Sequence, residues 1–215
     1  MKITILVSDK EHPINPYLEK WVKTVDSDHA VDIIRNKNEL TDGDLLFLIS
    51  CHDLITQKER NKYTKCLVVH ASDLPLGRGW SPHVWSIING EKEIIVSLLE
   101  AEDQIDSGRI WKKLRVYVPR TALFKQISQL LFDAELELMN FAIQSFNNLS
   151  PIDQDDLIEP AYWPKRSPID SQLDVDKSIS EQFNLIRICD PERYPAFFYI
   201  DGKKFTLTIE AADEE

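Results

Sequence analysis

Short, nearly continuous apolar runs recur along the first hundred residues. Five of them have the length and composition of buried strands: residues 3–7, 30–35, 44–50, 65–70 and 93–101. A strand that is apolar throughout is typical of a sheet covered on both faces. Segments of helical character separate these runs, and such alternation favours an open α/β sheet.

Apolar residues at steps of three and four predict helices over residues 15–25 and within 119–148. The second is long and amphipathic, a pattern that packing alone explains. Residues 81–89 predict a further helix, with Ser81 as N-cap and Pro82 at the first helical position. The polar segment between the third and fourth strands, residues 53–62, is also predicted to be helical.

The character of the chain changes after residue 149. Residues 150–180 are rich in Pro, Asp and Ser, which predicts a segment that runs over the surface. Residues 197–209 form two β-patterned runs joined by Asp201 and Gly202, a pair that favours a two-residue hairpin turn. We therefore divide the chain into a domain of residues 1–149 and a C-terminal extension of residues 150–215. The exposed strand of such a hairpin can pair with a second copy, which allows a homodimer.

Composition and charge exclude several classes of function. The chain has 215 residues and a formal net charge of -11, so we expect no nucleic-acid partner, because phosphate binding needs clustered cations. No run of about 18 apolar residues is present, so we expect no membrane span. Three cysteines without CxxC spacing fit free thiols in a reducing cytoplasm and predict no metal site.

The loop after the first strand narrows the choice of ligand. The sheet is expected to be Rossmann-like, yet residues 8–16 (SDKEHPINP) contain no glycine. The loop therefore lacks the GxGxxG turn that lets a pyrophosphate approach the backbone closely. Binding of a dinucleotide at this helix is excluded on steric grounds.

Candidate chemistry gathers in residues 68–85 (VVHASDLPLGRGWSPHVW) and in the loop after the next strand. His70 stands at the carboxyl end of a strand, where open α/β sheets bind their ligands. Asp106 lies in the loop that follows the 93–101 strand. If the two strands are neighbours, both loops open on one edge, and the two side chains lie within hydrogen-bonding reach. A carboxylate beside an imidazole raises its basicity and fixes its tautomer, as a base acting on an amine nucleophile requires.

This arrangement resembles the formyltransferase family that uses 10-formyltetrahydrofolate. The family pattern is H-x-S-x-L-P-x-x-x-G-x-x-P followed by D-x-G. Two downstream segments, YWPKRSPIDSQLD (162–174) and FNLIRICDPERYPAFF (183–198), also resemble family segments. The residues that match the pattern are His70, Ser72, Leu74, Pro75, Gly79, Pro82, Asp106 and Gly108.

The resemblance implies roles for these residues and makes residues 1–149 a formyltransferase catalytic domain. His70 would accept or relay the proton of the attacking amine, and Asp106 would orient His70. The family has an asparagine two positions before the histidine, where this chain has Val68. Three interpretations stay open. In the first, His70, protonated or backed by a backbone N–H, carries the oxyanion unaided. In the second, a polar group from another loop such as Ser50 or His52 substitutes, and in the third, activity is lost.

Binding residues also follow from the resemblance. The folate pterin would lie between two loops and contact mainly their backbone; the residues concerned are Ser50, Cys51, His52, Leu54, Ile55, Glu102, Asp103, Gln104 and Ile105. An anionic sugar nucleotide would meet a second set: Arg78, Gly79, Trp80, Lys165, Arg166 and Arg187. His12, His29 and His83 are expected on the surface.

The implied function is transfer of a formyl group from 10-formyltetrahydrofolate to the amine of a nucleotide-linked 4-amino-4,6-dideoxy sugar. The sequence of residues 68–85 most resembles that of the nucleotide-sugar N-formyltransferases of nonulosonic, pseudaminic-type pathways. Two alternatives stay open. One is a hydrolase that releases formate from the same folate. The other is a non-catalytic module that binds folate or nucleotide sugar, which the valine at position 68 would explain.

Overall fold

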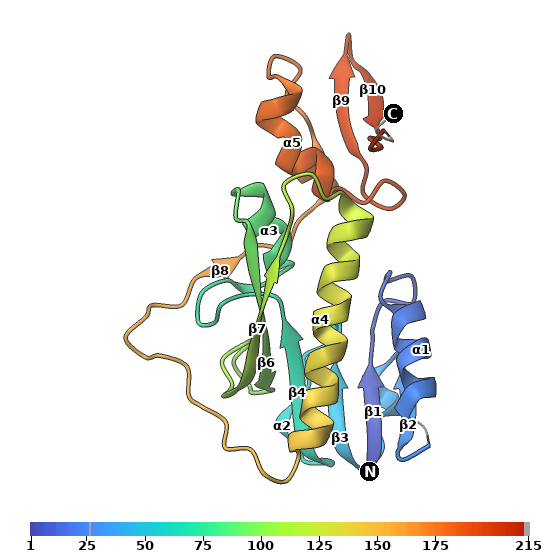
Figure 1. The fold of residues 1–215 in the computed structure, drawn as a ribbon, viewed down its shortest axis with the longest axis vertical. Coiled ribbons are helices and arrows are strands. Elements are labelled where there is room, and N and C mark those ends of the chain that lie inside the picture. The colour runs from blue at the N-terminus through green and yellow to red at the C-terminus, as the bar shows by residue number, and fades with distance from the viewer. Residues whose placement is uncertain (26, 213–215) are drawn as a thin grey trace.

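The computed structural model describes residues 1–25 and 27–212, and a twisted sheet forms the centre of the molecule (Figure 1). In the described part of the chain, this sheet has six strands in the order β2-β1-β3-β4-β6-β7. Their bounds are Lys2–Leu6 (β1), Ala30–Ile34 (β2), Gly43–Leu48 (β3), Tyr63–His70 (β4), Glu93–Glu100 (β6) and Ile110–Tyr117 (β7). The first four strands are parallel, whereas β6 runs antiparallel to β4 and β7 antiparallel to β6. The expected open, Rossmann-like α/β sheet is therefore confirmed.

The strand β7 has no counterpart in the sequence-based prediction. Its sequence, IWKKLRVY, carries three cations in eight residues, and the strand is only partly buried. An edge strand with one covered face alternates apolar and charged residues, so it lacks the continuous apolar run that identifies central strands.

The described part of the chain has five helices. They are α1 (Asn15–Val25), α2 (Gln57–Arg60), α3 (Pro82–Ile88), α4 (Phe124–Ser145) and α5 (Ile179–Ile188), with short 3-10 turns at Lys37–Glu39 and Pro168–Ser171. The long helix α4 was predicted, and it lies along the sheet beside α1 (Figure 1). The helix expected over 53–62 is shorter, a single turn with a capping box at Thr56. Pro82 does begin α3, but Ser81 has a left-handed φ of 44° and its side chain makes no cap bond.

The two hydrophobic cores, one on each face of the sheet, explain why the apolar runs of the strands are continuous. On β1, Ile3 and Ile5 face a large core that they share with α1 and α4, while Leu6 faces a smaller core that includes Leu40 and Ile55. Successive strand residues point to opposite faces, so a sheet with two covered faces buries nearly every position. His70 lies on the same face of β4 as Cys66 and Val68.

The C-terminal extension contains a hairpin, a helix and a short strand, all outside the six-stranded sheet. The hairpin of β9 (Ala196–Ile200) and β10 (Lys203–Leu207) turns at Asp201 and Gly202, whose φ values of 48° and 77° fit the predicted two-residue turn. Helix α5 packs against α3. The strand β8 (Tyr162–Trp163) pairs in parallel with β5 (Arg78–Gly79). Through this pairing the extension reaches back into the first domain, and the division at residue 149 stays an interpretation.

Among the described helices, none combines the length and the apolar character needed to cross a bilayer.

Candidate active site

His70 and Asp106 lie together at one edge of the sheet. Their nearest atoms, Nδ1 and Oδ1, are 3.6 Å apart, and each side chain is 8% exposed. The other ring nitrogen, Nε2, lies 2.9 Å from the carbonyl oxygen of Gly77. A carbonyl can only accept, so Nε2 carries the proton in this arrangement and Nδ1 faces the carboxylate.

The loop that carries Asp106 approaches His70 from a direction that the sequence did not predict. In the antiparallel pair β4–β6, His70 is opposite Ser97 and Leu67 is opposite Glu100, so β6 ends well behind the end of β4. The loop of residues 101–109 must then turn back toward His70. The two strands are neighbours as supposed, but their carboxyl ends point in opposite directions.

Gly108 is what allows this return. A Cβ on Gly108 would lie 1.9 Å from the carbonyl oxygen of Glu100, which no other residue could tolerate. Asp106 has a φ of 54°, and its Oδ2 accepts the backbone N–H of Gly79 at 2.9 Å. The glycine of the D-x-G motif therefore shapes the loop that places the carboxylate.

One arginine links the two loops that are predicted to hold a pterin. Arg60 of α2 donates to the carbonyl of Ile55 at 2.6 Å and to the carboxylate of Asp103 at 2.7 Å, which ties the two loops together. Ile55 is buried, Cys51 and Ser50 are half-buried, and Leu54 and His52 are exposed. In the second loop Glu102, Asp103, Gln104 and Ile105 are all exposed. No sequence pattern singles out Arg60.

Val68 occupies an apolar position beside these loops. Its half-buried side chain packs, with Cys51 and Ala101, against the smaller hydrophobic core. A valine side chain offers no hydrogen-bond donor. Ser50 and His52, on the loop after β3, remain the predicted polar substitutes.

Three of the predicted binding residues come together beside Gly79, whose N–H bonds to Asp106. The ring of His52 lies 5.2 Å from that of Trp80, and Lys165 Nζ lies 4.5 Å from the centre of the Trp80 ring. Arg166 lies 6.0 Å from the ring of Trp85 and donates to the carbonyl of Asp170. These contacts give one wall of aromatic rings and cations.

The other two arginines of the predicted set are enclosed by the protein. Arg187 is 3% exposed and donates to the carbonyls of Pro119 and Ala122, which joins α5 to the start of α4. Arg78 is 5% exposed and donates to Gln154 and to the hydroxyl of Tyr162. The structure thus separates both from the wall around Trp80.

All three histidines expected on the surface, His12, His29 and His83, are partly buried instead, and burial shifts the pKa of two of them. Burial lowers the pKa of His12 to about 4, and its Nδ1 accepts the N–H of Ile14 at 3.3 Å. Burial also lowers the pKa of His83 to about 4, with smaller contributions from the nearby His12 and His70. His12 follows the carboxyl end of β1, at the same sheet edge as His70, and that position was the signal available in the sequence.

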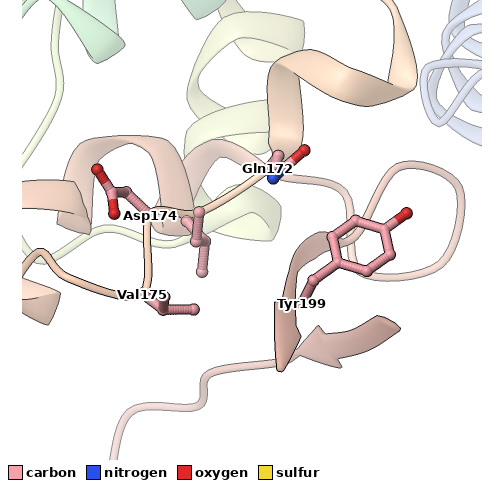
Figure 2. A pocket seen from close by; sticks show the side chains of 5 residues that line it. Gln172, Asp174, Val175 and Tyr199 are labelled. Carbon is pink, nitrogen blue, oxygen red and sulfur yellow. The ribbon is translucent and has the colours of Figure 1, made fainter. Parts of the chain in front are cut away.

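A cavity of about 600 Å³ opens at the same sheet edge and includes His52; the residues that line it are Ser8, Asp9, Glu11, His52, Glu192, Arg193 and Tyr194. A second, of about 360 Å³, lies beside the hairpin (Figure 2). There Gln172, Asp174 and Val175 precede α5 and lie across from Tyr199 of β9, and no residue of the His70 site takes part. No group of His, Cys, Asp or Glu within the described residues is arranged to hold a metal ion.

Proteins of known role resemble this chain in sequence or in fold. Residues 27–143, which include His70 and Asp106, match the family model named formyl transferase. Methionyl-tRNA formyltransferase of Malacoplasma penetrans is 34% identical over 147 residues, which are 66% of this chain and 45% of that protein. The chain therefore spans less than half the length of this relative.

Solved structures agree on the fold. A methionyl-tRNA formyltransferase from Clostridium thermocellum superposes with a TM-score of 0.81 at 24% identity, covering 99% of this chain and 94% of that one. A 4-N formyltransferase from Francisella tularensis gives 0.77 at 22% identity, covering 99% and 98%. HypX from Aquifex aeolicus, solved in complex with tetrahydrofolic acid, gives 0.78 at 21%, covering 97% and 37%. Because the family model matches more than half of the chain and spans both members of the His70–Asp106 pair, the protein belongs to the formyl transferase family.

Proposed function

We propose that the protein transfers a formyl group from 10-formyltetrahydrofolate to the amine of a nucleotide-linked 4-amino-4,6-dideoxy sugar. The observation that carries the proposal is the pairing of His70 with Asp106 inside the region that matches the family. A solved relative that holds tetrahydrofolate supports the choice of donor. The 4-N formyltransferase among the structural relatives supports an amine acceptor.

In the proposed reaction, the lone pair of the amine attacks the formyl carbon of the donor. The tetrahedral intermediate then expels N10 of the folate, and a proton moves from the attacking nitrogen to the departing one. With a proton already on Nε2, the free basic atom of His70 is Nδ1. A proton that rests there lies beside the Asp106 carboxylate, which stabilises the imidazolium.

The folate would bind between the loop of Ser50, Cys51, His52, Leu54 and Ile55 and the facing loop of Glu102, Asp103, Gln104 and Ile105. Arg60 links these loops and fixes their separation. A pterin is a flat ring with donors and acceptors at its rim, so the backbone groups of two loops held at a set distance suit it.

The acceptor would bind at the wall of Trp80, His52 and Lys165, with Gly79 at its base and Arg166 nearby. A ring and a cation side by side suit a nucleotide, which presents a base to stack and a diphosphate to neutralise. We leave Arg78 and Arg187 out of this contact set because their guanidinium groups bond inside the protein.

Aminoacyl-tRNA is the second candidate acceptor. The identity of 34% with a methionyl-tRNA formyltransferase favours it. The net charge of -11 weighs against it, because tRNA binding draws on clustered cations. We rank the nucleotide sugar first on this electrostatic ground.

A direct assay separates the alternatives. The purified protein is incubated with 10-formyltetrahydrofolate and, in turn, UDP- and dTDP-linked 4-amino-4,6-dideoxy sugars, charged initiator tRNA, or no acceptor, and products are identified by mass spectrometry. We expect a formamide on one of the sugars. Formylation of the tRNA alone would overturn the sugar acceptor, and formate release without acceptor would indicate the hydrolase. Tight folate binding without any product would indicate a binding module.

A further inference from the structure

We infer that Gln154, backed by Arg78, is a positioning residue that holds Asp106 against His70. The inference rests on the proposed function, because it assigns a role within the same reaction. Gln154 lies in the C-terminal extension, far along the chain from both catalytic side chains, and was not among the candidate residues.

The amide of Gln154 is bonded at both of its ends. Its Nε2 donates to the carbonyl of Asp106 at 2.8 Å and to that of Gly108 at 2.9 Å. Its Oε1 accepts from the guanidinium of Arg78 at 2.7 Å. One side chain thus spans both anchor residues of the D-x-G motif.

Arg78 determines which way this amide faces. A guanidinium only donates, so the atom of Gln154 that meets it must be the oxygen. The two N–H groups then have to face the loop. Arg78 itself is held by the hydroxyl of Tyr162 at 3.3 Å and by the Tyr162 ring at 5.9 Å. The same contact lowers the pKa of Tyr162.

The segment around Gln154 is otherwise open to water. From residue 152 to residue 162, every residue except Gln154 is exposed, and Leu157 reaches 95%. Just before Gln154, Ile152 exchanges two backbone hydrogen bonds with Ile110, at 2.7 and 2.9 Å. The segment is therefore anchored by its backbone at Ile152 and by the half-buried side chain of Gln154.

Asp106 needs such support. Its φ of 54° lies in the left-handed region, which costs energy for any residue other than glycine unless its surroundings hold it there. Two contacts do so, the Gly79 N–H on its carboxylate and the Gln154 amide on its carbonyl. Without the amide, the backbone can relax and swing the carboxylate away from His70, which is already 3.6 Å distant.

The variant Gln154→Glu tests this role with little change in size. It keeps an oxygen for Arg78, but it replaces the donor with a carboxylate oxygen that faces two carbonyls. We expect kcat to fall about 10- to 100-fold, with KM for both substrates nearly unchanged. The matched control is Gln182→Glu, whose amide bonds in the same way to the carbonyl of Asp174 at 2.9 Å. Its kinetics should stay at the wild-type level.

A double variant separates positioning from general support. If Gln154 acts through Asp106, adding Gln154→Glu to Asp106→Asn should cause almost no further loss of kcat. A residue that merely stabilises the fold would give losses that multiply. Multiplicative losses would therefore overturn the inference.

A measurement without turnover keeps the inference distinct from the proposed function. The ¹⁵N chemical shifts of the His70 ring report which nitrogen carries the proton, and they should change in Gln154→Glu but not in Gln182→Glu. If the wild-type protein transfers no formyl group, the proposed function fails and these spectra still test the link. Should Gln154→Glu fail to fold, Gln154→Met, which lacks both donors, is measured in the same way. Unchanged ring shifts in a folded Gln154 variant would refute the role.

Discussion

The His70 ring has an acceptor at each nitrogen, the Gly77 carbonyl at Nε2 and the Asp106 carboxylate at Nδ1. We expect His70→Ala to lower turnover by roughly 10²- to 10⁴-fold, the usual contribution of a positioned general base. Asp106→Asn should also lower it by orders of magnitude, because an amide cannot stabilise the imidazolium in the same way. Steady-state rates with the best acceptor measure both effects.

Melting temperatures should change little in these two variants, because both side chains lie at the edge of the sheet and outside the hydrophobic cores. Near-normal rates in either variant would remove the basis of the assignment.

Val68 raises a separate question at this scale, since the family places an asparagine there. One oxyanion donor contributes roughly 3 to 4 kcal/mol to transition-state stabilisation in other enzymes. We expect Val68→Asn to be tolerated or to raise kcat, since the new amide would supply the donor that the family places at this position. The measurement is kcat beside the urea midpoint, which detects any cost of placing an amide near Cys51 and Ala101. A collapse in activity without unfolding would mean that another group already fills the oxyanion position.

Sequence order was enough to predict that His70 and Asp106 lie close together, although the antiparallel direction of β6 means that the Asp106 loop has to turn back toward His70. It was not enough for Arg78 and Arg187. The charge of a residue does not indicate whether its side chain is buried. The oxygens that accept hydrogen bonds from these guanidinium groups belong to segments distant in the sequence. Gln154 gave no signal at all, because a lone glutamine in a polar segment looks like any surface residue.

Helix α4 carries an unusual carboxyl on an otherwise well-explained amphipathic surface. Glu135 is half-buried, and burial raises its pKa to about 8. In the unfolded chain the same group titrates near pH 4.3, so between about pH 4.3 and 8 the folded state binds more protons. Stability must therefore fall as pH rises through this window.

The variant Glu135→Gln should remove that dependence. At pH 8 we expect the variant to unfold at a higher urea concentration than the wild type, with a free energy of unfolding larger by roughly 1 to 2 kcal/mol. Near pH 4.5 the two proteins should be equally stable. The control is Glu137→Gln on the same helix, whose 62% exposed carboxylate pairs with Lys112. Urea titrations at pH 4.5, 6.5 and 8 provide the test. Equal pH slopes for the wild type and Glu135→Gln would contradict a buried carboxyl.

Elements with a strong period were predictable, and those set by pairing were not. The parallel strands, the long helix and the turn at Asp201–Gly202 all follow from patterns of burial or backbone conformation. The reversed direction of β6 leaves no trace in its own sequence, because a strand buried on both faces reads the same either way. The short pair of β5 and β8 depends on a contact between residues some 80 positions apart, which no local pattern encodes.

At the scale of the whole molecule, charge is the property that discriminates among acceptors. The chain has 36 Asp and Glu residues but only 25 Lys and Arg residues. The cations near the site, Lys165 and Arg166, are few and interleaved with tryptophans. A small anion needs only such a local group, whereas a tRNA meets the field of the entire surface.

We therefore expect this chain to bind initiator tRNA more weakly than about 10⁻⁴ M at physiological salt, the weak end of non-specific binding. Its apparent affinity should also show almost no dependence on salt, because few phosphates would be neutralised. The measurement is a fluorescence titration of labelled tRNA at 50 and 200 mM salt, with the nucleotide sugar that is turned over fastest as the positive control. Micromolar tRNA binding that weakens steeply with salt would show a basic surface that the composition hides, and would return aminoacyl-tRNA to first place among the acceptors.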